Sequence, residues 1–309
     1  MVKGNNVHDN GVRGETGTCD FGGIHIGTLG SREPVWIVNN AFANITAFAN
    51  GGEGMYADVG ATGQQLISNL VYNVSSTPLF WHVNPFVPMR ADATPSNITD
   101  NILISNAVPT PFYATSWDKR KGLEWWAYTP GHRFERNVVV VDYAATGTVL
   151  MWDGQPCGDI EDPAKTGVVC TDKLSDSFAK VTVDSNLYYN STSSWSLQSS
   201  QGAQNRAITP PTVHGHTRYP SHMPAGPNST ELSSSFPGLV DWREWRQMGH
   251  DKDSVLAHPE FVAPVHADYR LRPSSPALRL GMRPIDMNMV GPTWMPNPEM
   301  AENPLSPYE

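Results

Sequence analysis

Two short glycine-rich stretches hold the residues best suited to chemistry. Each stretch sets an aspartate beside paired glycines and a strand-like alternating segment: positions 19–27 contain Asp20, and positions 51–60 contain Asp58. Two carboxylates at close range can cleave a glycosidic bond, because one protonates the leaving oxygen while the other activates water or attacks the sugar. The alternative is that both aspartates cap glycine-rich turns, an ordinary role for this residue.

Histidine and aromatic side chains near these aspartates could bind a sugar. His25 alternates with two isoleucines, so it should point to the opposite side of its strand, and Tyr56 precedes Asp58 by two positions. Trp81 and His82 follow, just before a long insertion, and offer an aromatic face next to a polar group. For this pair a buried aromatic stack is the alternative.

Other candidates are more isolated. Glu124 stands before two tryptophans, and Trp152 stands before Asp153. The basic run at 119–121 could bind a uronate, although a solvated loop is its commoner role. The histidines of 214–222 have no cysteine or carboxylate pair nearby, so the sequence predicts no metal site and no resident cofactor.

A short sequence motif, called here the phrase, occurs six times and indicates the elements that would position these residues. It consists of an apolar residue, two variable residues and an asparagine, and an apolar cluster and a second Asn or Asp follow. The copies are 29 to 49 residues apart. Their first asparagines are Asn5, Asn40, Asn69, Asn101, Asn137 and Asn186, and the second positions are Asn10, Asn44, Asn73, Asn106, Asp142 and Asn190.

Self-similarity at such a period marks a repeat architecture. Short strands with an asparagine at a fixed bend favour an all-β solenoid, a parallel β-helix in which asparagine amides stack from coil to coil. The repeat period also predicts how far apart the two candidate aspartates lie. Asp20 and Asp58 are 38 residues apart, close to one period, so we expect them to stack about 5 Å apart.

The chain divides into four regions by composition. Residues 1–195 hold the coils, 196–240 form a long Ser/Pro/Gly-rich loop, 241–292 form a capping segment, and 293–309 form a proline-rich tail. The cap should begin with a short helix over 241–248 and continue with a final strand and a closing segment. Because Met1 falls inside a copy of the phrase, we expect that upstream coils are missing.

Composition narrows the classes of partner. The net charge is −9 without a strong acidic block, so nothing favours nucleic acid, and no apolar run is long enough for a membrane-spanning helix. Cys157 and Cys170 flank a loop and could form a disulfide, which would leave Cys19 over. We expect an extracellular monomer, an expectation that five N-glycosylation sequons support only weakly.

Several motifs together carry a family resemblance. They are Asp-x-Gly-Gly-Ile (20–24), Gly-Met-Tyr-Ala-Asp-Val-Gly (54–60), Asn-Leu-Val-Tyr-Asn (69–73), Gly-His-Asp-Lys-Asp-Ser (249–254), Asp-Tyr-Arg-Leu (268–271) and Pro-Ser-Ser-Pro-Ala-Leu (273–278). The combination resembles secreted right-handed β-helix proteins of the pectin-lyase-like superfamily, in particular the group that includes glycoside hydrolase family 141, with its α-L-fucosidases and xylanases. The resemblance implies a right-handed coil and assigns the catalytic pair to Asp20 and Asp58.

Three departures from that group's pattern fall near the predicted site. Val59 replaces a glutamate, Phe80 replaces the first histidine of a His-x-His, and His25 replaces a tyrosine. The sequence therefore favours a secreted glycoside hydrolase acting on a cell-wall polysaccharide. A polysaccharide lyase or uronate epimerase, in which Ca²⁺ could take part, is the second hypothesis. A non-catalytic carbohydrate-binding or surface β-helix is the third.

Overall fold

The structure, a computed structural model, describes residues 1–9, 22–27, 33–46, 52–58, 63–82, 94–106, 112–115, 131–141, 150–153, 181–190, 213–215, 239–240, 246–247 and 249–291. For residues 82, 112–115, 150–153, 190, 213–215 and 239–240 it describes the backbone alone. Strands in parallel sheets make up most of this part of the chain, which confirms the all-β class.

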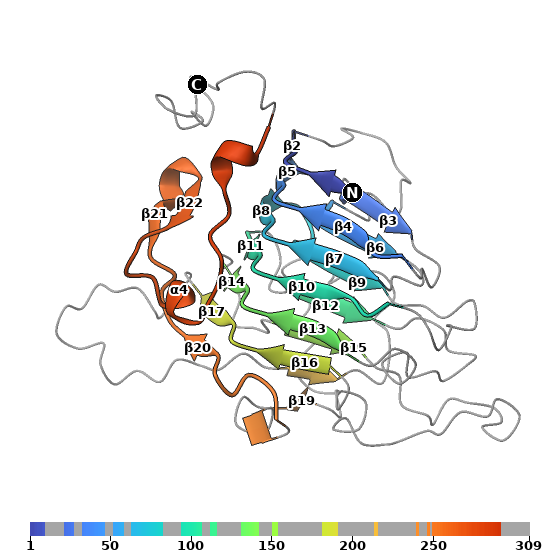
Figure 1. The fold of residues 1–309 in the computed structure, drawn as a ribbon, viewed down its shortest axis with the longest axis vertical. Helices are drawn as coiled ribbons and strands as arrows, with labels where there is room; N and C mark the ends of the chain where they lie inside the picture. Colours follow the sequence, from blue (N-terminus) through green and yellow to red (C-terminus); the bar gives the residue numbers. More distant parts are fainter. Residues whose placement is uncertain are drawn as a thin grey trace, which may run out of the picture.

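Successive strands join three sheets in turn, and Figure 1 shows the first sheet as a stack of arrows. The first sheet contains, in order, β1 (Val2–Lys3), β4 (Val35–Val38), β7 (Gln64–Ile67), β10 (Asn97–Thr99), β13 (His132–Glu135) and β16 (Val181–Asp184). The second contains β2 (Asn6–His8), β5 (Ala41–Ile45), β8 (Leu70–Val74), β11 (Ile102–Ser105), β14 (Val138–Val141), β17 (Leu187–Asn190) and β20 (Val255–Leu256). The third contains β3 (Gly22–Gly27), β6 (Glu53–Asp58), β9 (Leu79–His82), β12 (Phe112–Thr115), β15 (Leu150–Asp153), β18 (Val213–Gly215) and β19 (Leu239–Val240). Only β19 pairs antiparallel within these sheets as described.

The apolar first residue of each phrase builds one layer of the core. Ile37, Leu66, Ile98, Phe134 and Val183 are paired in register along the first sheet, and all are almost completely buried. Burial of one such side chain contributes about 1.5 to 3 kcal/mol. Each copy of the phrase therefore brings its own layer, and stacking the copies makes the core continuous.

The first asparagines of the phrases form a continuous column of hydrogen bonds, called here the asparagine ladder: Asn5, Asn40, Asn69, Asn101, Asn137 and Asn186. Each Nδ2 donates to Oδ1 of the next asparagine over 2.9 to 3.2 Å. Each backbone N–H of the first five donates to that same oxygen. From the second rung onward, Nδ2 also donates to the carbonyl of the apolar residue in the preceding copy. The predicted asparagine stack is confirmed.

The ladder stabilises a bend that the backbone would otherwise avoid. The residue before every rung has φ between 54° and 71°, and these residues are Gly4, Asn39, Ser68, Asp100, Arg136 and Ser185. A left-handed conformation costs a non-glycine residue roughly 1–2 kcal/mol. The left-handed residue turns the chain from the first sheet into the second, and backbone groups at the bend leave the strand pairing. The asparagine amides satisfy those groups, so the ladder offsets the cost of the bend.

A second polar column follows the ladder along the outer edge. Asn44 Nδ2 donates to Asp9 Oδ1 at 2.7 Å, and Asn73 Nδ2 donates to Asn44 Oδ1 at 2.6 Å. The backbone N–H of Asn73 donates to Asn106 Oδ1 at 2.8 Å. In the first copy, Asp9 takes this position instead of the predicted Asn10, because His8 pairs with Ala43 and so brings the next residue beside Asn44.

The ladder ends on an aspartate. Asn186 Nδ2 donates to Asp251 Oδ1 at 3.1 Å, and the backbone N–H of Asn186 donates to Ser254 Oγ at 2.8 Å. Asp251 also accepts from the Tyr188 hydroxyl at 3.1 Å and from Ser254 Oγ at 2.5 Å. Burial, and then the neighbouring Asp251 carboxylate, hold the pKa of Tyr188 well above its usual value, so the hydroxyl stays a donor. A carboxylate offers only acceptors and therefore receives the last donors of the ladder.

The chain after β20 forms a separate layer against the second sheet. β21 (Phe261–Ala263) and β22 (Asp268–Leu271) pair antiparallel, and the helix α4 (Pro276–Arg279) follows. The final strand and closing segment predicted here are thus a hairpin and a helical turn, while β20 is the strand that extends the second sheet. Of the predicted helix over 241–248, the structure describes Arg246 and Gln247, which are helical.

Residues 281–291, called here the C-terminal strap, run back along the bends of the ladder. In Figure 1 this segment, in the red part of the colour scale, passes beside the second sheet towards its first strands. Asp286 exchanges two hydrogen bonds with the side chain of Asn39. The backbone N–H of Gly291 donates to the carbonyl of Gly4 at 2.7 Å. The strap therefore connects repeats that do not contact one another directly.

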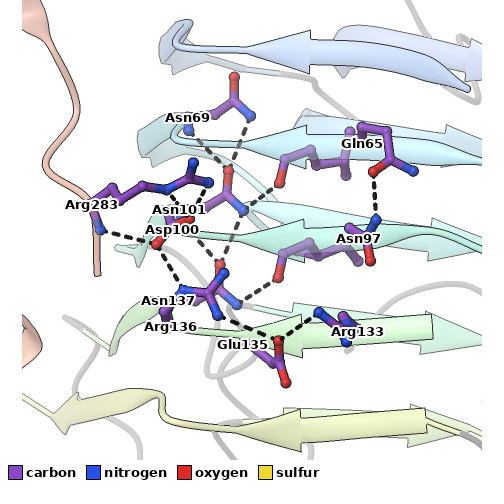
Figure 2. A network of polar contacts seen from close by, with 12 residues as sticks. Gln65, Asn69, Asn97, Asp100, Asn101, Arg133, Glu135, Arg136, Asn137 and Arg283 are labelled. Atoms are coloured by element: carbon purple, nitrogen blue, oxygen red, sulfur yellow. Dashed lines mark hydrogen bonds and ion pairs between the residues drawn. The ribbon is translucent and has the colours of Figure 1, made fainter. Parts of the chain in front are cut away.

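Figure 2 shows the strongest attachment of the strap, at a buried carboxylate. Asp100 is completely buried at a left-handed bend. Arg283 donates to it from Nε at 3.0 Å, from Nη2 at 2.7 Å and from its backbone N–H at 3.0 Å. Arg136 adds a bond from Nε at 3.2 Å. Two guanidinium groups thus compensate one buried charge, which would be costly to leave alone.

Replacing Arg283 with alanine should lower the free energy of unfolding by about 1 to 3 kcal/mol, because charge-assisted hydrogen bonds to a buried carboxylate are lost. Arg270→Ala is the matched control, since the Arg270 side chain bonds Asp268 on the exposed face of the hairpin. An exposed pair of this kind is worth at most about 1 kcal/mol. Chemical denaturation of the three proteins measures both effects. Equal losses would show that the strap adds nothing at Asp100.

Candidate functional site

The described candidate residues gather at the carboxyl ends of β3 and β6 in the third sheet. Side chains alternate along these strands, so one set fills the core and the other faces outward. Ile26, Ala57 and Trp81 share a register and are buried in the core. His25 and Tyr56 belong to the adjacent register and lie on the outer side. His25 points away from the isoleucines as predicted, with 42% of its side chain exposed.

Glycine permits close packing at the amino ends of β3 and β6. A Cβ on Gly54 would lie 2.0 Å from Cγ1 of Val71 and 2.7 Å from the carbonyl oxygen of Pro78. A Cβ on Gly23 would lie 2.8 Å from the carbonyl oxygen of Gly54. Gly23 and Gly54 therefore let β3 and β6 pass close to the second sheet and to each other. They set the position of the strands that carry the candidate residues.

Three side chains meet at Asp58, and they are called here the Asp58 cluster: His25, Tyr56 and Asp58. His25 Nε2 lies 3.2 Å from Asp58 Oδ2, so the tautomer protonated at Nε2 donates to the carboxylate. The Tyr56 hydroxyl donates to Asp58 Oδ1 at 3.3 Å. The Asp58 side chain keeps 23% of its surface exposed. Among the residues that the structure describes, the cluster therefore presents a partly exposed carboxylate that receives a donor on each oxygen.

Aromatic rings form a column beside the carboxylate. The rings of His25 and Tyr56 stack with centroids 4.7 Å apart and planes 20° apart, and Tyr56 and Phe80 follow at 5.0 Å. Their register along β3, β6 and β9 explains the column, since each ring stands above the corresponding position of the next strand. Only 6% of Tyr56 is exposed, so the predicted contact of its ring with a sugar is corrected. The exposed part of this column beside the carboxylate is His25, with 42% of its side chain exposed.

The strand register does not support the repeat period that was used to predict Asp20 beside Asp58. β3 and β6 pair with Gly27 opposite Asp58, an offset of 31 residues, where 38 would be needed. Asp20 itself lies outside the described residues, so its role as the second carboxylate stays a prediction. The groups that the structure brings to Asp58 are His25 and Tyr56, both of which the sequence had assigned to substrate binding.

Trp81 is a correction to the predicted sugar-binding face. Its side chain is completely buried, and it packs edge-on against the ring of His132 with centroids 5.3 Å apart. Burial lowers the pKa of His132 to about 3, so this ring is neutral, and its Nδ1 accepts from the backbone N–H of Ser96 at 3.0 Å. Trp81 thus belongs to the core and cannot offer a surface to a sugar.

Register brings three further candidates into the same sheet. His82, Thr115 and Asp153 fall in one cross-strand column at the carboxyl ends of β9, β12 and β15. Asp58 follows Ala57, which pairs with Trp81, so the same register continued by one residue would align Asp58 with His82. Sequence reasoning missed this relation between Asp58 and Asp153, because variable loops conceal the strand pairing that runs from β6 through β9 and β12 to β15. Trp152 falls in the column of Trp81, whose described members are core residues.

Several predicted residues lie outside the described part of the chain. They are Asp20, Glu124, Cys157 and Cys170, together with the basic run at 119–121. Within the residues described, no three His, Cys, Asp or Glu side chains gather as metal ligands. None of the helices in the described ranges is both long and apolar enough to cross a membrane.

A shallow cavity of about 420 Å³ lies in the C-terminal segment. Its polar lining is bonded within the chain, since Glu260 accepts from the Ser274 hydroxyl at 2.5 Å and Arg272 donates to the carbonyl of Val262. The Asp58 cluster, which combines an exposed histidine with an accessible carboxylate and an aromatic column, is therefore the better candidate. Comparisons of the chain with protein-family models, with curated proteins and with solved structures gave no match.

Proposed function

We propose that the three sheets are the faces of a right-handed parallel β-helix of the pectin-lyase-like kind. Strands recur in the same order, pair with the corresponding strand of the next repeat, and turn at an asparagine ladder. These features support a coil in which each repeat makes one turn. The right-handed hand follows from the general chirality of parallel crossovers as well as from the sequence resemblance.

On this fold, the protein acts as an extracellular glycoside hydrolase that cleaves a cell-wall polysaccharide. The observation that carries the proposal is the Asp58 cluster, a partly exposed carboxylate with donors from His25 and Tyr56 beside an aromatic column. A polysaccharide needs an extended face with stacking surfaces and a carboxylate at the scissile bond. The sequons are consistent with secretion, although Asn44 and Asn73 use their amides in the second polar column.

Hydrolysis at this site divides two roles between two carboxyl groups. An acid gives its proton to the glycosidic oxygen as the bond between that oxygen and the anomeric carbon breaks. The second group, as a carboxylate, takes a proton from the water that bonds to the anomeric carbon, or first bonds to that carbon itself. Asp58 provides one of these groups, and Asp20 is the predicted provider of the other.

Eliminative cleavage of a uronate polymer is a second candidate, and one observation favours it. His25 is exposed and is oriented by a carboxylate, which is the arrangement of a general base. Such a base would take the proton beside the uronate carboxyl group, and the glycosidic oxygen would leave as the double bond forms. A cation such as Ca²⁺ commonly neutralises the uronate in such reactions, and Asp58 could contribute to holding it.

A screen of the purified protein on fucosylated polysaccharides, xylan and pectic polysaccharides tests the proposal. New reducing ends without ultraviolet absorbance from unsaturated sugars are the result expected for hydrolysis. New reducing ends together with that absorbance would replace hydrolysis by elimination. Binding without new ends or sugar conversion on any substrate would contradict catalysis and leave a carbohydrate-binding β-helix.

A further inference from the structure

We propose that Asp58 is the ionised carboxylate of the site, held in that state and orientation by His25 and Tyr56, so that it serves as base or nucleophile. His25 and Tyr56 are then positioning residues, and the proton for the leaving oxygen comes from another group. The catalytic meaning of this assignment rests on the proposed function. The assignment itself concerns the charge and geometry of one side chain.

The donors around Asp58 carry the argument. His25 Nε2 addresses Oδ2 at 3.2 Å, and the Tyr56 hydroxyl addresses Oδ1 at 3.3 Å. Hydrogen bonds from donors stabilise a carboxylate, whereas a protonated carboxyl group would have to give up an acceptor position on one oxygen.

The donors are fixed by the fold. His25 and Tyr56 occupy paired positions on β3 and β6, and their rings stack almost parallel. Tyr56 is also packed against Phe80, and only 6% of the tyrosine is exposed. A hydroxyl on a ring clamped from two sides cannot swing away, so Oδ1 stays engaged. His25 supplies a nitrogen donor to Oδ2.

The surroundings of Asp58 contain these two titratable groups on the described strands. His25 comes from β3 and Tyr56 from the strand of Asp58 itself, while β9 places the backbone of His82 in the adjoining register. Phe80 contributes an apolar ring. The described side chains therefore bring a donor to each oxygen of Asp58. In hydrolysis Asp58 takes the proton of the attacking water or bonds to the anomeric carbon.

The test is a carboxyl-carbon NMR measurement on protein labelled at aspartate, at a pH near the ordinary midpoint of about 3.9 for an aspartate. We expect the wild-type Asp58 signal at the shift of a carboxylate. His25→Phe keeps a stacking ring and removes a donor, and Tyr56→Phe does the same, so both should move the signal towards the protonated form. His25→Gln retains a donor and should resemble the wild type, and the exposed Asp253 is the internal reference.

A protonated Asp58 in the wild type at that pH would overturn the assignment, as would a signal that neither phenylalanine variant moves. Because the spectrum needs no substrate, a protein without activity would refute the proposed function and leave this test intact. Where activity is found, His25→Phe should lower kcat by roughly 10- to 100-fold with little change in KM, because the carboxylate is misplaced while sugar contacts remain. Activity of His25→Gln should recover most of that loss.

Discussion

Replacing Asn101 with alanine should lower the free energy of unfolding by about 4 kcal/mol or more, because one member of the buried asparagine ladder is lost. Oδ1 of this asparagine accepts from both the backbone and the side chain of Asn69, at 2.9 and 3.0 Å. Its Nδ2 donates to the Leu66 carbonyl at 2.8 Å and to Asn137 Oδ1 at 3.0 Å. Alanine removes the side-chain partner of the Asn69 backbone N–H and of the Leu66 carbonyl, and it leaves Asn69 Nδ2 and Asn137 Oδ1 with one bond fewer. Each buried group left unpaired costs about 1–3 kcal/mol.

The control for Asn101→Ala is Asn73→Gly in the exposed second column. Asn73 has φ of 51°, a conformation that glycine adopts freely, and water can replace the amide bonds of Asn73. We expect a change within about 1 kcal/mol. Thermal and denaturant unfolding of both variants gives the comparison. Similar losses of unfolding free energy for the two variants would contradict the prediction, because the buried ladder would then stabilise the protein no more than the exposed second column.

Replacing Asp251 with alanine should have the next largest effect, about 3–5 kcal/mol, because it removes the acceptor at which the ladder ends. Asn186, Tyr188 and Ser254 each direct a donor at this carboxylate. All of them are buried, so water cannot take its place without opening the end of the core. Breaking such a polar network by deleting one member commonly costs this much.

Denaturant unfolding with hydrogen exchange at β17 and β20 measures the loss at Asp251. Asp253→Asn is the matched control, since Asp253 is exposed and its backbone N–H, which the substitution keeps, makes the hydrogen bond to Asp184. We expect this control to unfold like the wild type. If Asp251→Ala also unfolded like the wild type, the hydrogen bonds that Asp251 accepts at the end of the ladder would not stabilise the protein.

The bends of the fold were readable in the sequence because one side-chain amide solves one recurring problem. At each bend the backbone loses its strand partners, and an asparagine replaces them with its own donor and acceptor groups. The requirement recurs in every copy, so it leaves an asparagine at the same place each time. Asn69 and Asn101 could therefore be assigned to one column from sequence alone.

The candidate site was harder to predict, since no similar requirement fixes the spacing of the third sheet. Gly27 pairs with Asp58 at an offset of 31 residues, and Met55 pairs with Leu79 at an offset of 24. Loops of unequal length separate this sheet from the bends, so the spacing of the asparagines does not predict the strand register of the third sheet. The prediction that Asp20 lies near Asp58 depended on the asparagine spacing. The contact of His25 with Asp58 follows instead from the observed pairing of β3 with β6.

Trp81 shows a second limit of sequence reasoning. β9 reads Leu-Phe-Trp-His, so both faces of the strand carry large apolar or aromatic residues and alternation does not reveal which face is inward. The register with Ala57 decides the matter and places the tryptophan in the core. The same reasoning leaves Phe80 with Tyr56 in the outer aromatic column.

The central claim is that polysaccharide cleavage takes place at Asp58, and the most direct measurement compares the rate of reducing-end release by the wild type and by Asp58→Asn. On the substrate identified by the screen, we expect Asp58→Asn to lose roughly 100- to 10,000-fold in kcat while keeping the stability of the wild type, because the amide can neither take a proton nor bond to the sugar. Asp253→Asn should keep full activity. Release by Asp58→Asn within about twofold of the wild type would contradict the claim and place the chemistry elsewhere on the chain.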